Sequence, residues 1–146
     1  MNLNNSLIWM FIGSIIIGLF LNGMNILAFR YSDLYLSYTL IYSASLMASL
    51  MCIVEILMYY HHSGKFSMTM FLLFLTFSII CIFLLRNQFL INDNQWLKRM
   101  ISHHSTALTT SHKIKERTKN DKVKKLASEI IETQEREIKL MKSLLQ

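Results

Sequence analysis

The sequence predicts an all-α protein with three transmembrane helices followed by a C-terminal antiparallel helical hairpin. Three long apolar blocks precede residue 92, and a helix of about 20 apolar residues spans the ~30 Å hydrocarbon layer of a bilayer. Beyond residue 92 the chain is charged, and its apolar residues recur every three or four positions, as on one helix face. We therefore divide the chain into a transmembrane region, residues 1–91, and a hairpin domain, residues 92–146.

The apolar blocks place the three spans at about residues 7–29, 38–60 and 66–85. Glu55 is the only formally charged side chain inside them. Aromatic rings such as those of Trp9, Tyr38 and Tyr60 lie near the span ends, where amphipathic rings collect at the headgroup level. The first span lacks the basic segment of a cleaved signal peptide and a second span follows closely, so we expect it to be retained.

One face of the second span carries a stripe of five side chains. They follow one another at spacings of four, four, three and four: Met47, Met51, Glu55, Met58 and His62. Thioether, carboxylate and imidazole groups in a row could pass a soft cation along the membrane. Methionine is also an ordinary filler of apolar cores, so helix packing is the competing interpretation.

The charge of the chain is concentrated in its last third. The net charge is +6, and from Asn92 onward twelve Lys or Arg residues stand against seven Asp or Glu. A basic segment beside a membrane favours anionic headgroups. Acidic residues are interleaved with the basic ones and no recognition motif is visible, so we expect the lipid bilayer, and no nucleic acid, as a partner.

The tail reads as two helices joined by a polar turn at residues 118–121. The first helix has a stripe stepping by three and four: Leu97, Met100, His104, Ala107, Ser111 and Ile114. The second has a matching stripe: Val123, Ala127, Ile130, Gln134, Glu137, Met141 and Leu144. Such spacing indicates that each helix buries one face against the other.

Polar residues interrupt both stripes at the same level of the hairpin. If the turn lies near residues 119 and 120, residue i pairs with roughly residue 239 − i, because both helices rise 1.5 Å per residue. His104 then faces Gln134 and Glu137, and Met100 faces Met141. A buried polar group without a partner is unfavourable, so clustering is expected with or without a metal.

Two interpretations of this level remain open. In the first it is a metal site with the candidate ligands Met100, His103, His104, Glu137 and Met141, supported by Gln134 and His112 as a polar layer or second shell. Thioether and imidazole together favour copper, and Cu(I) above zinc or magnesium. In the second, the polar layer only sets helix register. One hairpin supplies few ligands, so a metal site predicts dimerisation into a four-helix bundle.

The tail resembles a known family. The segments M-I-S-H-H-S-T-A-L at residues 100–108 and D-K-V-K-K-L-A-S-E-I-I-E-T-Q-E-R-E-I-K-L-M-K at residues 121–142 are similar to the family of unknown function marked by Met-Ile-Pro-His-His. The resemblance covers about the last fifty residues. With the three spans it indicates a membrane-anchored branch of that family.

The resemblance implies a ferritin-like helical bundle, and soluble relatives are associated with periplasmic copper binding and tolerance. It implies the ligand candidates Met100, His103, His104 and Met141. Two positions depart from the family pattern. Ser102 stands where the family usually has proline, and Thr110 stands where the soluble relatives often have methionine.

These observations predict a membrane-anchored copper-binding protein of metal handling or tolerance, forming a homo-oligomer through its hairpin. The alternative is a non-catalytic interaction or scaffold protein. We expect no enzyme, because the hairpin lacks the Glu-x-x-His pairs of di-iron bundles. We expect the cell (inner) membrane. Lys and Arg near the spans favour a cytoplasmic tail, but the resemblance favours an extracytoplasmic one, which we adopt.

Overall fold

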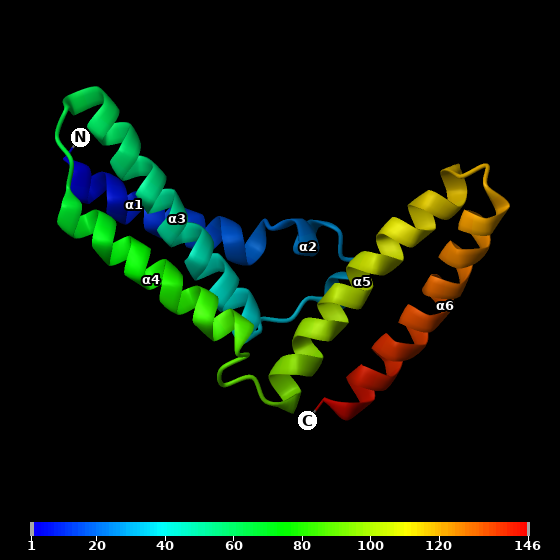
Figure 1. Cartoon of the computed structure of the whole chain (residues 1–146). Helices are drawn as coiled ribbons and strands as arrows, with labels where there is room; N and C mark the ends of the chain where they lie inside the picture. Colours follow the sequence, from blue (N-terminus) through cyan, green and yellow to red (C-terminus); the bar gives the residue numbers. More distant parts are fainter. Residues whose placement is uncertain (1, 146) are drawn as a thin grey trace. The chain divides into compact units, whose positions relative to one another are not determined.

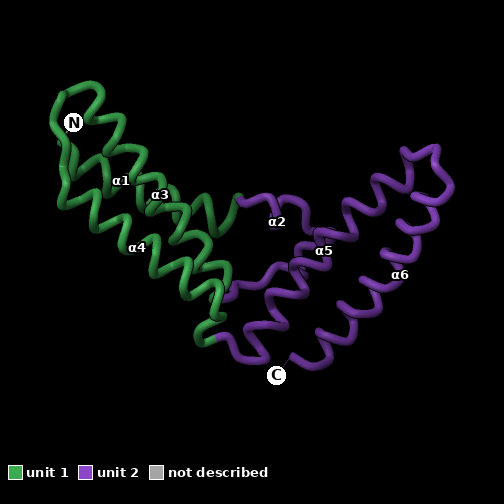
Figure 2. The backbone as a smooth tube through the Cα atoms, viewed as in Figure 1, with its two compact units in different colours: residues 1–21, 38–90 green, residues 22–37, 91–146 purple. Residues whose placement is uncertain are grey.

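The computed structural model of the protein describes residues 2–145, and every regular element in that range is helical. The helices form two compact units, coloured separately in Figure 2. One unit comprises the chain up to Leu21 together with residues 38–90, and the other comprises residues 22–37 together with the chain from Ile91 onward. The predicted all-α fold class is confirmed, with three long apolar helices and a C-terminal hairpin.

The first unit contains three long helices, α1 (Leu3–Phe20), α3 (Tyr38–Ser63) and α4 (Met68–Arg86), and α3 packs against both of the others (Figure 1). Gly18 allows α1 to approach α3 closely. A Cβ atom placed on Gly18 would lie only 2.9 Å from the Cβ atom of Ala44. Small residues at such crossings are typical of helix pairs in membranes.

Three helical segments are long and apolar enough to cross a membrane: Leu3–Ile26, Tyr38–Ser63 and Met68–Arg86. Within the protein, only 11% of the most apolar window of Met68–Arg86 is buried. Most of its apolar side chains therefore point outward. Contact of these side chains with water is unfavourable, whereas contact with lipid is not. The length and composition of these segments are compatible with membrane insertion.

The first predicted span, residues 7–29, ends earlier than its hydropathy indicated. Helix α1 stops at Phe20, and the short helix α2 (Gly23–Ile26) follows. The side chain of Asn22 caps α2 by accepting two backbone N–H bonds, at 3.0 and 3.1 Å. This local cap starts a new helix, and residues 22–37 then pack with the hairpin, although the prediction placed them in the transmembrane region.

The other two spans differ from prediction only at their ends. Helix α3 continues to Ser63, where Gly64 takes a left-handed conformation with φ of 69°, as glycine does after a helix. Helix α4 does not run on into the tail, because Gln88 and Leu90 both have positive φ, 49° and 58°.

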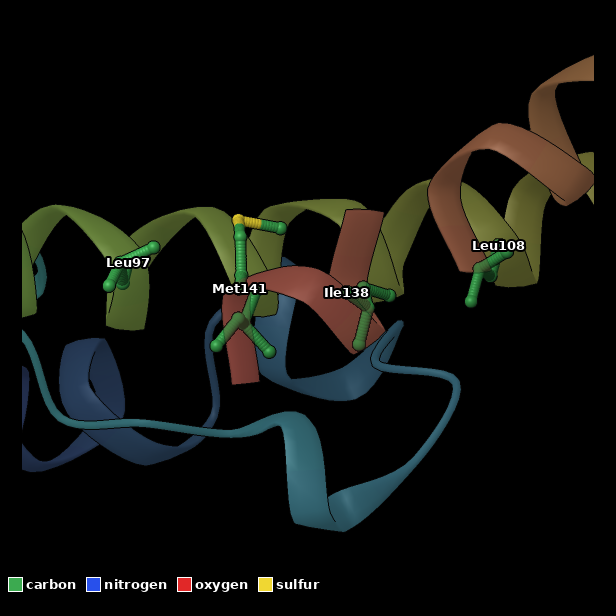
Figure 3. Close-up of a cluster of buried hydrophobic side chains, with 5 residues drawn as sticks. Leu97, Leu108, Ile138 and Met141 are labelled. Carbon is green, nitrogen blue, oxygen red and sulfur yellow. The ribbon is translucent and has the colours of Figure 1, made fainter. Parts of the chain in front are cut away.

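The second unit is built on an antiparallel hairpin of α5 (Asp93–Arg117) and α6 (Asp121–Leu144). Asn92 caps α5, because its Oδ1 accepts the Gln95 N–H at 3.0 Å. Asn120 caps α6. The buried core between the helices comprises Leu97, Ile101, Leu108, Ile138 and Met141. In Figure 3, Met141 and Ile138 of α6 lie between Leu97 and Leu108 of α5.

Residues 22–37, which we call the strap, complete the second unit. The strap contains α2 and the short 3₁₀ helix η1 (Tyr31–Asp33), and both contact α5. Its attachment is polar. Ser105 Oγ accepts the Phe29 N–H at 2.9 Å, and Thr106 Oγ1 donates to the carbonyl of Met24 at 3.2 Å.

Candidate functional site

The candidate site lies midway along the hairpin, where His104 of α5 meets Glu137 of α6. His104 Nδ1 and Glu137 Oε2 are 3.7 Å apart, and the side chains are 14% and 42% exposed. This separation is too long for a hydrogen bond. A mostly buried imidazole therefore lies close to a partly solvated carboxylate, at the level where the antiparallel register pairs the two helices.

Two polar atoms at this level lack hydrogen bonds. Among residues 2–145, neither His104 Nδ1 nor Gln134 Oε1 has a hydrogen-bond partner, although both atoms are buried. A buried polar atom normally finds a partner, because desolvation without one costs about 1–3 kcal/mol. The Gln134 oxygen, and His104 Nδ1 in the tautomer that carries the proton on Nε2, each have a lone pair that could bind a cation or accept a hydrogen bond.

Burial lowers the pKa of His104 from its ordinary value of 6.5. The carboxylate of Glu137 opposes this effect by raising the pKa, and the neighbouring His103 adds to the lowering. The imidazole is therefore neutral at pH 7. A neutral ring keeps a lone pair for a metal ion, so the electrostatics at His104 suit a ligand.

The other predicted ligands differ in how far they are buried. Met141 is buried in the hairpin core, and Met100 packs against that core from α5. His103 is exposed, with its ring centroid 5.9 Å from that of His104. No three His, Cys, Asp or Glu side chains within residues 2–145 are grouped closely enough to hold a metal ion. Within residues 2–145, a single hairpin therefore does not present a complete ligand set of these four residue types.

His112 lies elsewhere on α5. Its ring stacks on Phe29 of the strap, with centroids 4.9 Å apart and an interplanar angle of 8°. Eight residues of helix, about 12 Å of rise, separate it from His104. His112 therefore packs against the strap, and the structure does not bring it to the polar layer for which it was proposed.

The predicted stripe of the second span lies largely on the outside of the first unit. Met47, Met51 and Met58 are exposed on α3, as is His62, whose Nδ1 lies 2.8 Å from the Met58 carbonyl. Glu55 instead accepts a hydrogen bond from Ser6 Oγ of α1. Within one chain the thioethers face outward, so they do not fill the core.

An ion pair between a buried carboxylate and a partly exposed lysine, which the sequence did not reveal, holds the strap to the hairpin. Asp33 is fully buried, and its Oδ1 lies 2.5 Å from Lys142 Nζ of α6. Ser105 Oγ of α5 donates to its other oxygen, Oδ2, at 2.7 Å. At the surface, Arg30 pairs with Glu135 at 2.7 Å. Short hydroxyl side chains at positions 102, 105, 106 and 109 share one face of α5, and this was the available signal.

The serine at position 102 has a specific role in this contact. Ser102 Oγ donates to the backbone carbonyl of Asp33 at 2.8 Å and accepts the Tyr35 N–H at 3.3 Å. A proline at this position would have no hydroxyl and would also interrupt the α5 backbone. Ser102 is therefore suited to a chain whose strap lies on α5.

Comparisons with known proteins agree with a helical tail of unknown role. The profile of a family described as "Domain of unknown function (DUF305)" matches residues 87–145. Uncharacterized protein L153 of Acanthamoeba polyphaga mimivirus is 34% identical over 143 residues, covering 98% of this chain and 93% of L153. No solved structure matches the chain. The similarity to L153 extends through the apolar helices as well as the hairpin.

Proposed function

We propose that this chain, which belongs to the same family as L153 and matches the domain of unknown function DUF305 over residues 87–145, is anchored in a membrane and binds copper at the middle of its hairpin. In this proposal the three apolar helices anchor the protein in the cell membrane, with the hairpin on the extracytoplasmic side. Copper is the cargo of a metal-handling or tolerance protein, and the protein is not an enzyme.

The observation that supports copper most directly is the unpaired, neutral His104. Its buried Nδ1 has no hydrogen-bond partner among the described residues, and burial lowers its pKa. Met100 and Met141, each four residues along its helix from His104 and Glu137 respectively, supply thioethers at the hairpin core. Imidazole and thioether donors favour Cu(I) over harder divalent ions. The residues present therefore fit copper, as part of a ligand set.

Glu137 and Gln134 have supporting roles in this proposal. A carboxylate 3.7 Å from His104 Nδ1 can ligate Cu(II) or orient the imidazole from outside the ligand shell. Gln134 Oε1 is another buried atom without a hydrogen-bond partner among residues 2–145, and this amide oxygen can accept a hydrogen bond from an imidazole N–H. The side chain of His103 is exposed, so it can reach a metal ion from the solvent side.

The alternative is an interaction protein in which His104, Gln134 and Glu137 only set helix register. This reading is favoured by the one observation that no group of three potential metal-binding side chains, counting His, Cys, Asp and Glu, exists within residues 2–145. It predicts that replacing His104 by leucine keeps or raises stability, because an unpaired buried polar atom is removed.

Competition for Cu(I) separates the two functions. The full-length chain in detergent is titrated against a chromophoric Cu(I) chelator under reducing conditions. We expect His104→Leu and Met141→Leu to weaken Cu(I) binding at least tenfold, since each removes a donor. Met141→Leu preserves volume, so its packing effect is small.

His112→Leu is the matched control, because His112 lies on the same helix but stacks on Phe29. We expect it to bind Cu(I) as the unmodified chain does. Cu(I) at about 100 times its Kd should also raise the stability of the unmodified chain by about 2.7 kcal/mol. Equal Cu(I) affinity in the unmodified chain, His104→Leu and Met141→Leu would refute copper binding at this site.

A further inference from the structure

The two broad faces of the hairpin differ. One face is covered by the strap, which contacts α5 at Ser102, Ser105 and Thr106. The same strap reaches α6 at Glu135 and Lys142. Both helices are therefore occupied on that side by a segment of their own chain.

The opposite side, which we call the open face, carries a seam on each helix. On α5 the seam residues are Trp96, Met100, His103, Ala107, Thr110 and Ile114. On α6 they are Val123, Leu126, Ile130, Thr133, Glu137, Leu140 and Leu144. At 100° per residue the α5 seam lies about 120° around the helix from the residues that hold the strap.

The two seams belong to one surface. Trp96 of α5 and Leu144 of α6 line the same pocket at one end of the hairpin. Glu137 of the α6 seam lies beside His104, next to the α5 seam residue His103. Steps of three and four along both seams make the seven-residue repeat of helices that pack against further helices.

The open face exposes enough apolar surface to form an interface. Six of its large side chains have 37 to 57% of their surface exposed: Trp96, Ile114, Val123, Leu126, Leu140 and Leu144. Their exposed fractions together equal about three whole side chains, which at about 150 Å² each, the low end of the range for aromatic side chains, is about 450 Å². A standard interface needs about 800 Å² per partner, somewhat more than half of it apolar. The exposed apolar area is therefore close to the requirement.

We propose that the open face docks onto the open face of a second copy of this chain and forms a four-helix bundle. A second copy fits because the surface is laid out symmetrically. Its ends are apolar, with Trp96 and Leu144 at one and Ile114 and Val123 at the other, and its middle is polar. A two-fold axis through the middle places like surfaces against each other. Ala107, small and central, allows close helix approach.

Docking also brings two copies of the candidate site together. Each copy supplies an exposed His103 and a His104 with a free Nδ1 in the part of the chain that the structure describes. The ligand set that one hairpin leaves incomplete would thus be completed by the partner copy. This consequence rests on the proposed copper function, whereas the docking itself rests on the apolar seams and holds without metal.

The first test is the mass of the full-length protein in detergent with a metal chelator present. We expect the mass of two 17.2 kDa chains for the unmodified protein. The double variant Leu126→Lys, Leu140→Lys should be monomeric. Both side chains are more than half exposed in one copy, so the helices should fold unchanged, which circular dichroism verifies. Leu36→Lys is the matched control, because Leu36 is 59% exposed on the strap, and it should remain dimeric.

The second test is cross-linking in membranes with a bismaleimide, again without copper. Thr110→Cys places a thiol on the open face, and Glu132→Cys places one on an exposed position of α6 outside the seam. Cys52 and Cys81 are buried, so the unmodified chain gives the background. We expect Thr110→Cys to cross-link into dimers at least tenfold more than Glu132→Cys.

A monomeric unmodified chain, or a lysine double variant as dimeric as the unmodified chain, would overturn the proposal. So would equal cross-linking from the two cysteine positions. A dimer that binds no Cu(I) in the competition experiment would refute the copper function and leave the docking intact. Conversely, a monomer that binds Cu(I) with His104-dependent affinity would refute docking alone.

Discussion

Replacing Lys142 by methionine should release the strap from the hairpin. Lys142 Nζ lies 2.5 Å from Oδ1 of the fully buried Asp33, and its own side chain is 32% exposed. Methionine keeps much of the side-chain length and removes the charge. The carboxylate of Asp33 would then stay buried without the lysine charge, although the Ser105 hydroxyl still donates to its Oδ2. An uncompensated buried charge is among the most destabilising changes in a protein.

The expected loss follows from the burial of the two partners. Removing one partner of a fully buried pair costs about 3–5 kcal/mol. Part of the lysine is already in water here, so we expect about 2–3 kcal/mol, expressed as easier opening of the strap. Since 1.4 kcal/mol is a factor of ten, the open population should rise roughly 30- to 150-fold.

Hydrogen–deuterium exchange measures this opening locally. The N–H groups of Phe29 and Tyr35 donate to Ser105 and Ser102, so their exchange reports release of the strap. We expect exchange in residues 29–35 to accelerate by the factor above in Lys142→Met. Lys139→Met is the matched control, because Lys139 is an exposed lysine one turn earlier on α6 and should change nothing.

A second substitution tests the cause. Adding Asp33→Asn to Lys142→Met removes the stranded charge while the amide oxygen can still accept the Ser105 hydroxyl. Most of the protection from hydrogen–deuterium exchange that Lys142→Met removes should return in this double variant. Unchanged exchange in Lys142→Met, or no recovery in the double variant, would refute the view that this ion pair holds the strap.

Two further predictions concern other parts of the chain. Gly18→Ala should lower the free energy of unfolding of the detergent-solubilised protein by about 1–3 kcal/mol, because the new Cβ would lie 2.9 Å from that of Ala44. In the control Gly13→Ala the new Cβ meets nothing within 4 Å, so this variant should be as stable as the unmodified protein. Equal effects of the two substitutions on thermal unfolding would contradict the close helix approach. Copper-free protein should lose stability as the pH falls below about 6.5, because the lowered pKa of His104 means that the unfolded chain binds the proton more readily. Melting temperatures measured between about pH 7.5 and about pH 5.5 test this, and the melting temperature should fall less with decreasing pH in His104→Leu. If that substitution leaves the pH dependence unchanged, His104 is not its cause.

Hydropathy was a good guide to the long helices and a poor guide to where the first one ends. The apolar run continues to Phe29, yet α1 stops at Phe20. Two polar interactions decide this. Asn22 caps a new short helix nearby, and the Phe29 N–H bonds to Ser105, which is 76 residues away in sequence. A hydropathy average along the sequence carries no information about helix caps or about hydrogen-bond partners distant in sequence.

The candidate site was predictable as far as register allowed. Equal rise along two antiparallel helices is enough to place His104 near Glu137, because the turn position fixes the pairing. Register does not specify which way a side chain turns. His112 stacks on Phe29 because the strap occupies that side of α5, and the strap's position was not visible in the pattern of α5.

By itself the sequence determined the elements of this protein: three apolar helices, a polar turn at about residues 118–121 and two amphipathic tail helices whose polar residues share a level. These features depend on local composition and periodicity, which a single chain displays directly. Only the tertiary structure decided that the strap covers one face of the hairpin and leaves the other open. Asp33, Ser105 and Lys142 are far apart in sequence, and only folding brings the Lys142 ammonium group to the buried carboxylate that needs a partner.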